Sequence, residues 1–343
     1  MLFPVIWASN PTVSNSSVTV QYCRPTTAAI NVTLFPNQQW NGNVYSESGS
    51  YITKLLNSKG CDSIIVTNVT VLKGTLQGKF TVEAGKQVWF SSGNLQYQAK
   101  AEIGDSVHVV IGDTMARGIW RFAEHQYDIV GKSNIFLLKE YQGWIDLFAF
   151  GTSGYNGKYP YLISTTGTDY TTTNLNTDVN YDWGMYNSIS NGGNHYGLWF
   201  TPTYSHMQYI LFSRPRATML HSVGTVENVR GLILLPDDWM TPESVSFTPQ
   251  ASNYTINKYS ANEWNIMESQ GAVFLPSAGY RSATVAPTFY PDYIQYWTAT
   301  ASNTSAYRLY MDNGASANYT ANTIFQTGTN YYGRAVRLVR WVQ

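Results

Sequence analysis

Residues 271–343 constrain the fold most strongly, because two strand-like ends enclose a long aromatic and polar middle. The segment opens with the apolar run 272–275 and closes with residues 335–340, in which arginines alternate with apolar residues. Short apolar runs of this kind, bounded by Gly and Pro, are typical of strands. The sequence therefore predicts β-structure at both ends of the segment.

The middle of this segment has a different composition. Between Arg281 and Tyr332 aromatic residues are interleaved with Asn, Thr, Ser, Ala and Gly; they are Tyr290, Tyr293, Tyr296, Trp297, Tyr307, Tyr310, Tyr319, Phe325, Tyr331 and Tyr332. Tyrosine supplies large contact area at low entropic cost, and Ser, Gly and Asn supply adaptable hydrogen bonds, as in antibody combining sites. The composition favours binding over catalysis. The alternative is an ordinary β-rich globule whose aromatic residues fill the core.

The chain is poor in charge. Charged residues make up 12%, against about a quarter in ordinary globular proteins, aromatic residues reach 15%, and the net charge is zero. A surface of hydroxyls and amides favours a β-rich cell-surface, secreted or virion protein. We expect no nucleic-acid partner, because a neutral chain lacks a basic stripe to neutralise phosphates.

The N-terminal residues give weaker signals. Residues 1–10 are apolar but contain Pro4 and no basic residue, so they resemble at best a remnant of a signal peptide, or follow a misplaced start. No run approaches eighteen apolar residues, so we expect no membrane-spanning segment. Cys23 and Cys61 permit one disulfide at most and have no histidine pair near them for zinc. Their pairing stays open.

Residues 11–73 are expected to form a small β-domain. Alternating or β-branched runs at 17–22, 29–35, 43–45, 50–56 and 63–71 are separated by turn-forming stretches such as PNQQ, NGN and SESGS. Short antiparallel strands in this arrangement predict an Ig-like sandwich that serves as a spacer. A boundary follows at KGTLQG, residues 73–78.

Residues 79–343 are expected to form an α+β domain. Strands are predicted around Phe80 and Val88, and the run RGLILLPDDWM reads as a buried strand and turn. A helix is predicted over 204–214, with Met207, Ile210 and Leu211 on one side, because these residues follow a helical period. A second is predicted over 260–270, with Ser260 and Glu263 as a capping box.

A series of short motifs in this region carries a family resemblance: GNLQYQ, WRFAEHQYD, GWIDLFAFGTSGYN, YDWG, ILLPDDW, GAVFLPSAGYR, YWTAT, SAYRLYM and GRAVRLVR. They resemble surface or secreted proteins of gut bacteria, and related phage proteins, with a C-type-lectin-like domain of the formylglycine-generating-enzyme-like branch. Several of these are targets of diversity-generating retroelements, which mutate the final segment at adenines. The resemblance implies a non-enzymatic adhesion protein whose hypervariable segment, residues 281–334, forms a ligand-binding face.

The N-terminal region carries a second resemblance. Residues 40–71 resemble small β-repeats found in tandem in adhesin-like proteins of gut bacteria. In those repeats a cysteine shortly before the tryptophan pairs with the one in GCDS. Phe35 occupies that place here, so the resemblance leaves both a Cys23–Cys61 pair and two free cysteines open.

Alternation in SAYRLYMDN indicates how a binding face is built. If Tyr307, Leu309 and Met311 point inward, neighbouring side chains point outward together. The predicted contact residues are these outward positions, positions before Trp297 and the polar stretch that follows: Tyr290, Tyr293, Gln295, Arg308, Tyr310, Asp312, Asn318, Tyr319, Asn322, Phe325, Tyr331 and Tyr332. The expected ligand is a protein or a glycan on another cell or phage surface.

Signals for catalysis or metal binding are weak. The histidines have no metal-ligand spacing, and His125 beside Glu124 is better explained by packing than by general-base chemistry. Adjacent Asp237 and Asp238 favour a turn over a hydrolytic pair. The copper chemistry of formylglycine-generating relatives is not expected, because no cysteine follows Cys61. We expect no cofactor and no catalytic residue, with structural calcium in the Trp/Gly-rich loops as an alternative.

Two alternatives to a binding protein stay open from the sequence. A carbohydrate-active enzyme requires two carboxylates that converge in a cleft. A fimbrial or surface subunit requires that the final strand be donated to a neighbour. The oligomeric state is not predicted.

Overall fold

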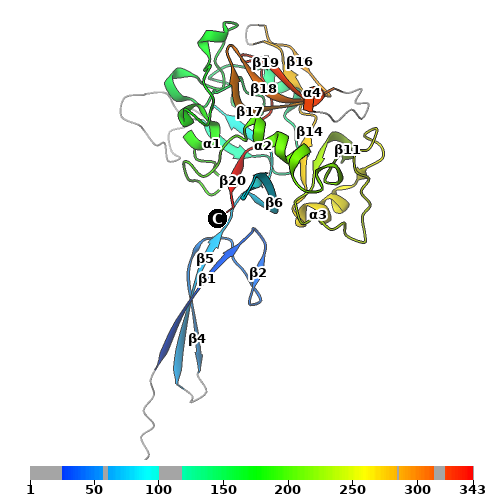
Figure 1. Ribbon diagram of the computed structural model, residues 1–343. Coiled ribbons are helices and arrows are strands. Elements are labelled where there is room, and N and C mark those ends of the chain that lie inside the picture. The colour runs from blue at the N-terminus through cyan, green and yellow to red at the C-terminus, as the bar shows by residue number, and fades with distance from the viewer. Residues whose placement is uncertain (1–24, 57–60, 100–117, 284–285, 313–320, 343) are drawn as a thin grey trace, which may run out of the picture. The chain divides into compact units, whose positions relative to one another are not determined.

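The computed structural model describes residues 25–56, 61–99, 118–283, 286–312 and 321–342. The chain divides into two compact units, residues 1–34 with 45–71 and residues 35–44 with 72–343 (Figure 1). It is mostly β-sheet with few helices, which agrees with an α+β or a mainly-β class. No helix in the described ranges is long and apolar enough to cross a membrane.

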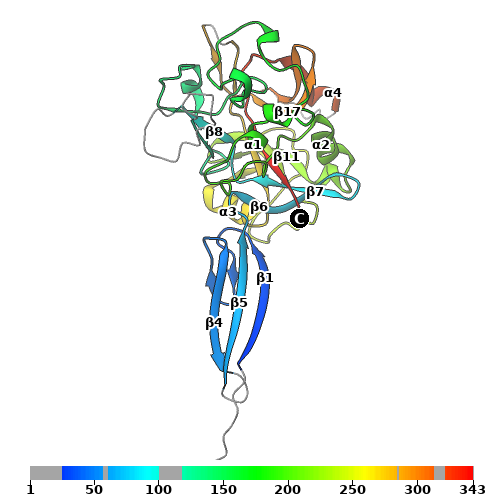
Figure 2. The same ribbon diagram turned by 90° about the vertical axis from the view of Figure 1, so that its left-hand side faces the viewer.

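The described part of the first unit is one three-stranded sheet in the order β1-β5-β4 (Figure 2). β1 (Thr26–Leu34) is parallel to β5 (Asp62–Val71), which is antiparallel to β4 (Gly49–Leu56). The expected run 17–22 lies outside the described residues, and a sandwich needs a second sheet. The Ig-like sandwich therefore stays a prediction.

Cys61 is buried in this unit and disulfide-bonded. This excludes the alternative of two free cysteines. The other cysteine of the chain, Cys23, lies outside the described residues.

The second unit contains six small sheets within the described residues. Their orders are β2-β3, β20-β7-β6, β10-β8-β9, β13-β11-β12-β14, β15-β16 and β17-β18-β19. The strands are β2 (Gln39–Trp40), β3 (Asn43–Val44), β6 (Thr75–Glu83), β7 (Lys86–Ser91), β8 (Leu95–Gln98), β9 (Ile119–Phe122), β10 (Trp144–Ile145), β11 (His221–Val226), β12 (Val229–Leu234), β13 (Lys258–Tyr259), β14 (Val273–Pro276), β15 (Tyr280–Arg281), β16 (Phe289–Tyr290), β17 (Ile294–Ser302), β18 (Ser305–Met311), β19 (Phe325–Thr329) and β20 (Val339–Trp341).

The helices are short. They are α1 (Trp183–Tyr186), α2 (Tyr204–Gln208), α3 (Ala261–Ser269) and α4 (Ala321–Ile324), with 3-10 turns at Gly131–Ile135, Tyr155–Gly157, Gly167–Asp169, Val179–Tyr181 and Ala217–Met219. The predicted capping box of α3 is confirmed, since the Ser260 backbone N–H donates to Glu263 Oε2 at 2.8 Å and the Glu263 N–H donates to Ser260 Oγ.

The helix predicted over 204–214 is shorter than expected. α2 ends at Gln208 and continues as a π-helical turn, Tyr209–Ser213, in which the Arg214 N–H donates to the Tyr209 carbonyl. The buried Arg214 guanidinium also bonds the Ile210 and Leu235 carbonyls, and these bonds hold the widened turn. Met207, Ile210 and Leu211, which were expected on one side of the helix, are all buried.

The closing run 335–340 is only partly a strand. β20 begins at Val339, and the preceding residues run extended between sheets. The Ala335 N–H donates to the Gln295 carbonyl of β17, and the Leu95 N–H of β8 donates to the Val336 carbonyl. This segment joins three sheets, so it does not form one ladder of its own.

Candidate functional site

The sheet β17-β18-β19 has an apolar inner face and a polar outer face. Ile294, Tyr296, Leu309, Met311 and Phe325 are adjacent in the strand register and buried in one core cluster. Arg308 and Tyr310 are half-buried on the opposite side of β18, and Asp312 beyond its end is exposed. The predicted alternation is confirmed for these residues. Tyr307 differs: it is half-buried and packs on Tyr204 at a ring distance of 4.8 Å.

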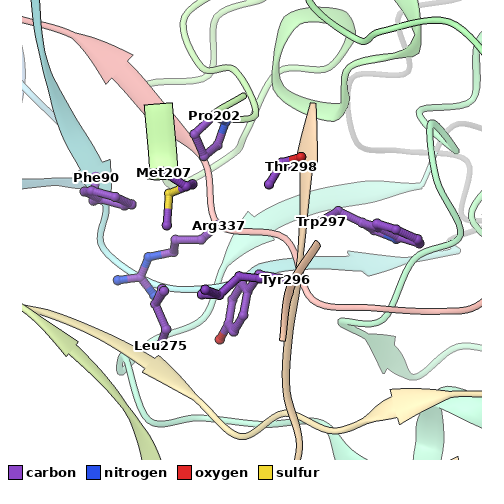
Figure 3. A pocket seen from close by; sticks show the side chains of 9 residues that line it. Phe90, Pro202, Met207, Leu275, Tyr296, Trp297, Thr298 and Arg337 are labelled. Carbon is purple, nitrogen blue, oxygen red and sulfur yellow. The ribbon is translucent and has the colours of Figure 1, made fainter. Parts of the chain in front are cut away.

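Among the described residues, the inner face lines a cavity that is too small for a ligand. The cavity there is about 10 Å³, room for at most a single water, and Figure 3 shows Phe90, Met207, Leu275, Tyr296 and Arg337 around it. Any ligand of this sheet therefore meets the outer face or the segments that flank it.

Six tyrosines from four chain segments gather beside the outer face; we call them the tyrosine face: Tyr280, Tyr290, Tyr293, Tyr310, Tyr331 and Tyr332. Tyr280 is the centre. Its ring is stacked on Tyr290 at 4.7 Å, lies parallel to Tyr332 at 6.3 Å and meets Tyr293 edge-on at 5.2 Å. Tyr293 then reaches Tyr310 at 6.2 Å, and Tyr332 reaches Tyr331 at 5.3 Å. Tyr290 is exposed and the other five are half-buried, so the face is accessible.

The hairpin β15-β16 holds this centre in place. Tyr280 pairs with Tyr290 across the hairpin, and the Gly279 N–H donates to the Tyr293 carbonyl. Gly279 has φ +76°, and an added Cβ would lie 2.3 Å from the Tyr290 carbonyl oxygen. Glycine is required there for both reasons.

The structure brings together five of the twelve predicted contact residues: Tyr290, Tyr293, Tyr310, Tyr331 and Tyr332. Two predictions are wrong. Gln295 is 1% exposed, because its side-chain oxygen accepts hydrogen bonds from Arg308 and Arg334 beneath the face. Phe325 is 6% exposed, because it packs in the hydrophobic core. Asn318 and Tyr319 lie outside the described residues. Asn322 lies in α4, but its side chain is not described.

Arginines lie directly beneath the tyrosines. Arg308 Nη1 and Arg334 Nε both donate to Gln295 Oε1, at 2.6 and 2.8 Å. The Arg334 guanidinium also lies 4.1 Å from the Trp297 ring and 5.4 Å from the Tyr332 ring. Arg281, the residue after Tyr280, is fully buried and donates to the Ala283 and Leu147 carbonyls.

Two glycines make this arrangement possible. An added Cβ at Gly333 would lie 2.6 Å from Arg281 Nη2, and one at Gly328 would lie 2.6 Å from Arg334 Nη2 and 3.1 Å from Arg308 Cδ. The guanidinium groups therefore pack directly on bare backbone. Tyr280, Arg281 and Arg334 were not among the predicted contact residues. The motif GYR, residues 279–281, beside a Tyr-rich segment was the available signal for Tyr280 and Arg281.

The positive charges of the arginines at this site are not matched by carboxylates in the described part of the chain. Among the described residues, no carboxylate forms an ion pair with Arg281, Arg308 or Arg334. Burial lowers the pKa of Arg281 to about 10, and burial together with the nearby charges of Arg308 and Arg281 lowers the pKa of Arg334. Burial and neighbouring tyrosines raise the pKa of Tyr280, which stays a hydroxyl donor at neutral pH.

The other chemical candidates have structural partners. Asp237 Oδ2 accepts from the Thr81 N–H and from Gln87, and Oδ1 accepts from Arg214 Nη1 at 2.9 Å. His125 Nδ1 lies 3.3 Å from Asp128 Oδ2, and its ring stacks on Tyr127. No group of three or more His, Cys, Asp or Glu side chains converges within the described ranges.

A second concavity lies elsewhere in this unit. It has a volume of about 420 Å³, with Phe35, Gln38, Gln77 and Asn265 in its wall. Glu268 is the single carboxylate that lines it, and burial raises the pKa of this residue. A two-carboxylate hydrolytic site needs a second acid, which this concavity lacks among its lining residues.

Comparison with models of known protein families, with curated proteins and with solved structures gives no match.

Proposed function

We propose that the protein is a non-enzymatic ligand-binding and adhesion protein whose tyrosine face contacts a partner at a cell or phage surface. The supporting observation is the continuous set of six accessible tyrosine rings around Tyr280. Such rings supply rigid apolar contact area together with hydroxyl groups, and aromatic residues with arginine are enriched where binding energy concentrates.

In the same proposal, residues 79–343 form a C-type-lectin-like domain and residues 11–73 an Ig-like spacer. The predominance of sheet over helix is compatible with both. The segment 281–334 is proposed to be varied by a diversity-generating retroelement. Five of the predicted contact residues lie both in this segment and in the tyrosine face, which supports this assignment. The proposed location is the cell surface or the secreted fraction.

The first test of variability uses the neighbouring DNA. We expect a near-copy of the coding segment for residues 281–340, beside a reverse transcriptase gene, that differs from it at adenines of the copy. If genome sequence on both sides contains no such copy, retroelement diversification is wrong, whereas a fixed binding face stays open to the next test.

The test of binding compares two tyrosine clusters. Tyr280→Ser removes the centre of the tyrosine face. Tyr155→Ser removes the centre of a separate cluster, in which Tyr155 meets Tyr181 at 5.1 Å and Tyr186 at 5.5 Å. Full-length protein is used to select binders from a random peptide library on phage. We expect Tyr280→Ser to weaken the selected binders at least about tenfold and Tyr155→Ser to leave them within about twofold. Equal effects would contradict the proposal.

A further inference from the structure

Two positively charged groups converge on one neutral acceptor beneath the tyrosine face. Arg308 Nη1 and Arg334 Nε share Gln295 Oε1, and within the described part of the chain Arg308 reaches one further side-chain acceptor, Gln326 Oε1, at 3.4 Å. Buried Arg308 Nε and buried Arg281 Nε have no hydrogen-bond partner among the residues that the structure describes. Arg334 Nη1 also donates to the Thr329 carbonyl at 2.9 Å, yet these arginines still present more buried donors than the described residues satisfy.

Such an arrangement is costly without an anion. A buried charge is normally paired, and arginine forms its strongest contacts with carboxylates through two parallel hydrogen bonds. Arg334 is 1% exposed and Arg308 is half-buried at the surface, so the second is the residue that an incoming group meets first. The unpaired buried donors are an observation independent of the tyrosine rings.

We propose that the partner of the tyrosine face is a protein that inserts an Asp or Glu carboxylate between the tyrosines onto Arg308, with Arg334 behind it. This rests on the proposed function and specifies its ligand. A peptide ligand is favoured over a sugar because Tyr280, the central ring, is already stacked with Tyr290 and Tyr332, which leaves fewer free ring faces for a pyranose. Aromatic rings around an arginine–carboxylate pair exclude water from it and strengthen it.

The test extends the peptide selection on the full-length protein. One random library contains all residues and a matched library lacks Asp and Glu. We expect binders from the complete library to contain an acidic residue whose change to Asn or Gln weakens binding about tenfold or more. Arg308→Gln should weaken them by a similar factor, and the two changes together should cost little more than either alone.

Two variants control the interpretation. Arg308→Lys keeps the charge without the planar fork, so we expect partial binding. Arg121→Gln is the matched control, because Arg121 also donates to a glutamine, Gln96, and stacks on a ring, Trp144, outside the face. It should leave binding unchanged. Thermal unfolding of each variant separates loss of the contact from loss of the fold.

The outcomes distinguish the two proposals. Binders that need Tyr280 but tolerate Arg308→Gln, or that come equally well from the library without acidic residues, overturn the carboxylate inference and leave the binding function intact. Binders that tolerate Tyr280→Ser overturn the function itself. Binding that needs Tyr280, Arg308 and the ligand acid supports both.

Discussion

Asp146 and His221 are buried groups whose pKa values move in opposite senses. Burial raises the pKa of Asp146 to about 6, against hydrogen bonds from the Val130 N–H and Asn134, and burial lowers the pKa of His221 to about 4. As pH falls below about 6, the folded state takes up a proton at Asp146 and gains stability. Below about 6.5 the unfolded state takes up a proton at His221, so stability is lost. Asp146 and His221 therefore change the unfolding free energy in opposite directions as pH falls.

His221→Asn should isolate the contribution of His221 to the pH dependence of stability. Asparagine keeps a donor for the Ala217 carbonyl, which His221 Nδ1 contacts at 2.9 Å, but it does not titrate. The unfolding free energy of the variant minus that of the wild type should rise as pH falls from 6.5 to 4, by up to about 3 kcal/mol. Urea unfolding at a series of pH values measures this difference. A difference that does not change with pH would contradict the assignment of His221.

Gly333→Ala tests the packing of arginine on bare backbone. The added methyl would lie 2.6 Å from the guanidinium of Arg281, which is fully buried and donates to the Ala283 and Leu147 carbonyls, so a shift that relieves the clash disturbs these bonds. We expect a loss of about 1–3 kcal/mol in unfolding free energy. Adding Arg281→Met removes the obstructing group, so the double variant should be more stable than the sum of the single changes predicts. Strict additivity would show that the methyl acts elsewhere.

Single residues were predictable where a local pattern decides them. The alternation in β18 placed Leu309 and Met311 inside and Arg308 and Tyr310 outside. Gln295 was misplaced because its burial depends on Arg308 and Arg334, the second of which comes from a distant part of the chain. Tyr280 was missed for the same reason: its role comes from Tyr332, which no spacing in the sequence relates to it.

At the scale of elements, the caps were more predictable than the lengths. The Ser260–Glu263 box marked the start of α3 correctly, since its hydrogen bonds are local. The π-turn after α2 depends on where Arg214 finds carbonyl acceptors and Asp237, which only the fold supplies. The shortness of β20 likewise follows from a C-terminal run shared among several sheets.

The α3 cap gives the element-scale prediction. Ser260→Ala removes the acceptor of the Glu263 N–H and the hydroxyl partner of Glu263 Oε2, so the unfolding free energy should fall by about 1 kcal/mol. Ser260→Thr retains the hydroxyl and should cost much less. Urea unfolding of both variants measures the difference. Equal losses would mean that side-chain size, and not the cap, matters at this position.

At the scale of the whole molecule, the sequence predicted two parts but not the path of the chain between them. Residues 35–44 belong to the second unit, although residues on both sides of them belong to the first. The contact of Phe35 with Trp89, at 5.5 Å between ring centroids, helps to place them there. A linear division at residues 73–78 could not reveal this, because turn-forming residues mark loops without showing which unit a loop packs on.

The disulfide should therefore stabilise one unit only. Cys61 falls in the first unit, and the second unit contains no cysteine. Removing a native disulfide typically lowers the unfolding free energy of a small domain by about 2–5 kcal/mol, and we expect a loss of this size in the first unit when the Cys61 disulfide is reduced. Hydrogen–deuterium exchange with and without dithiothreitol should show faster exchange in β1, β4 and β5 and unchanged exchange in β17, β18 and β19. Peptide binding at the tyrosine face should survive reduction. Faster exchange throughout would show that the second unit depends on the first for its stability, and the binding face would then require the intact chain.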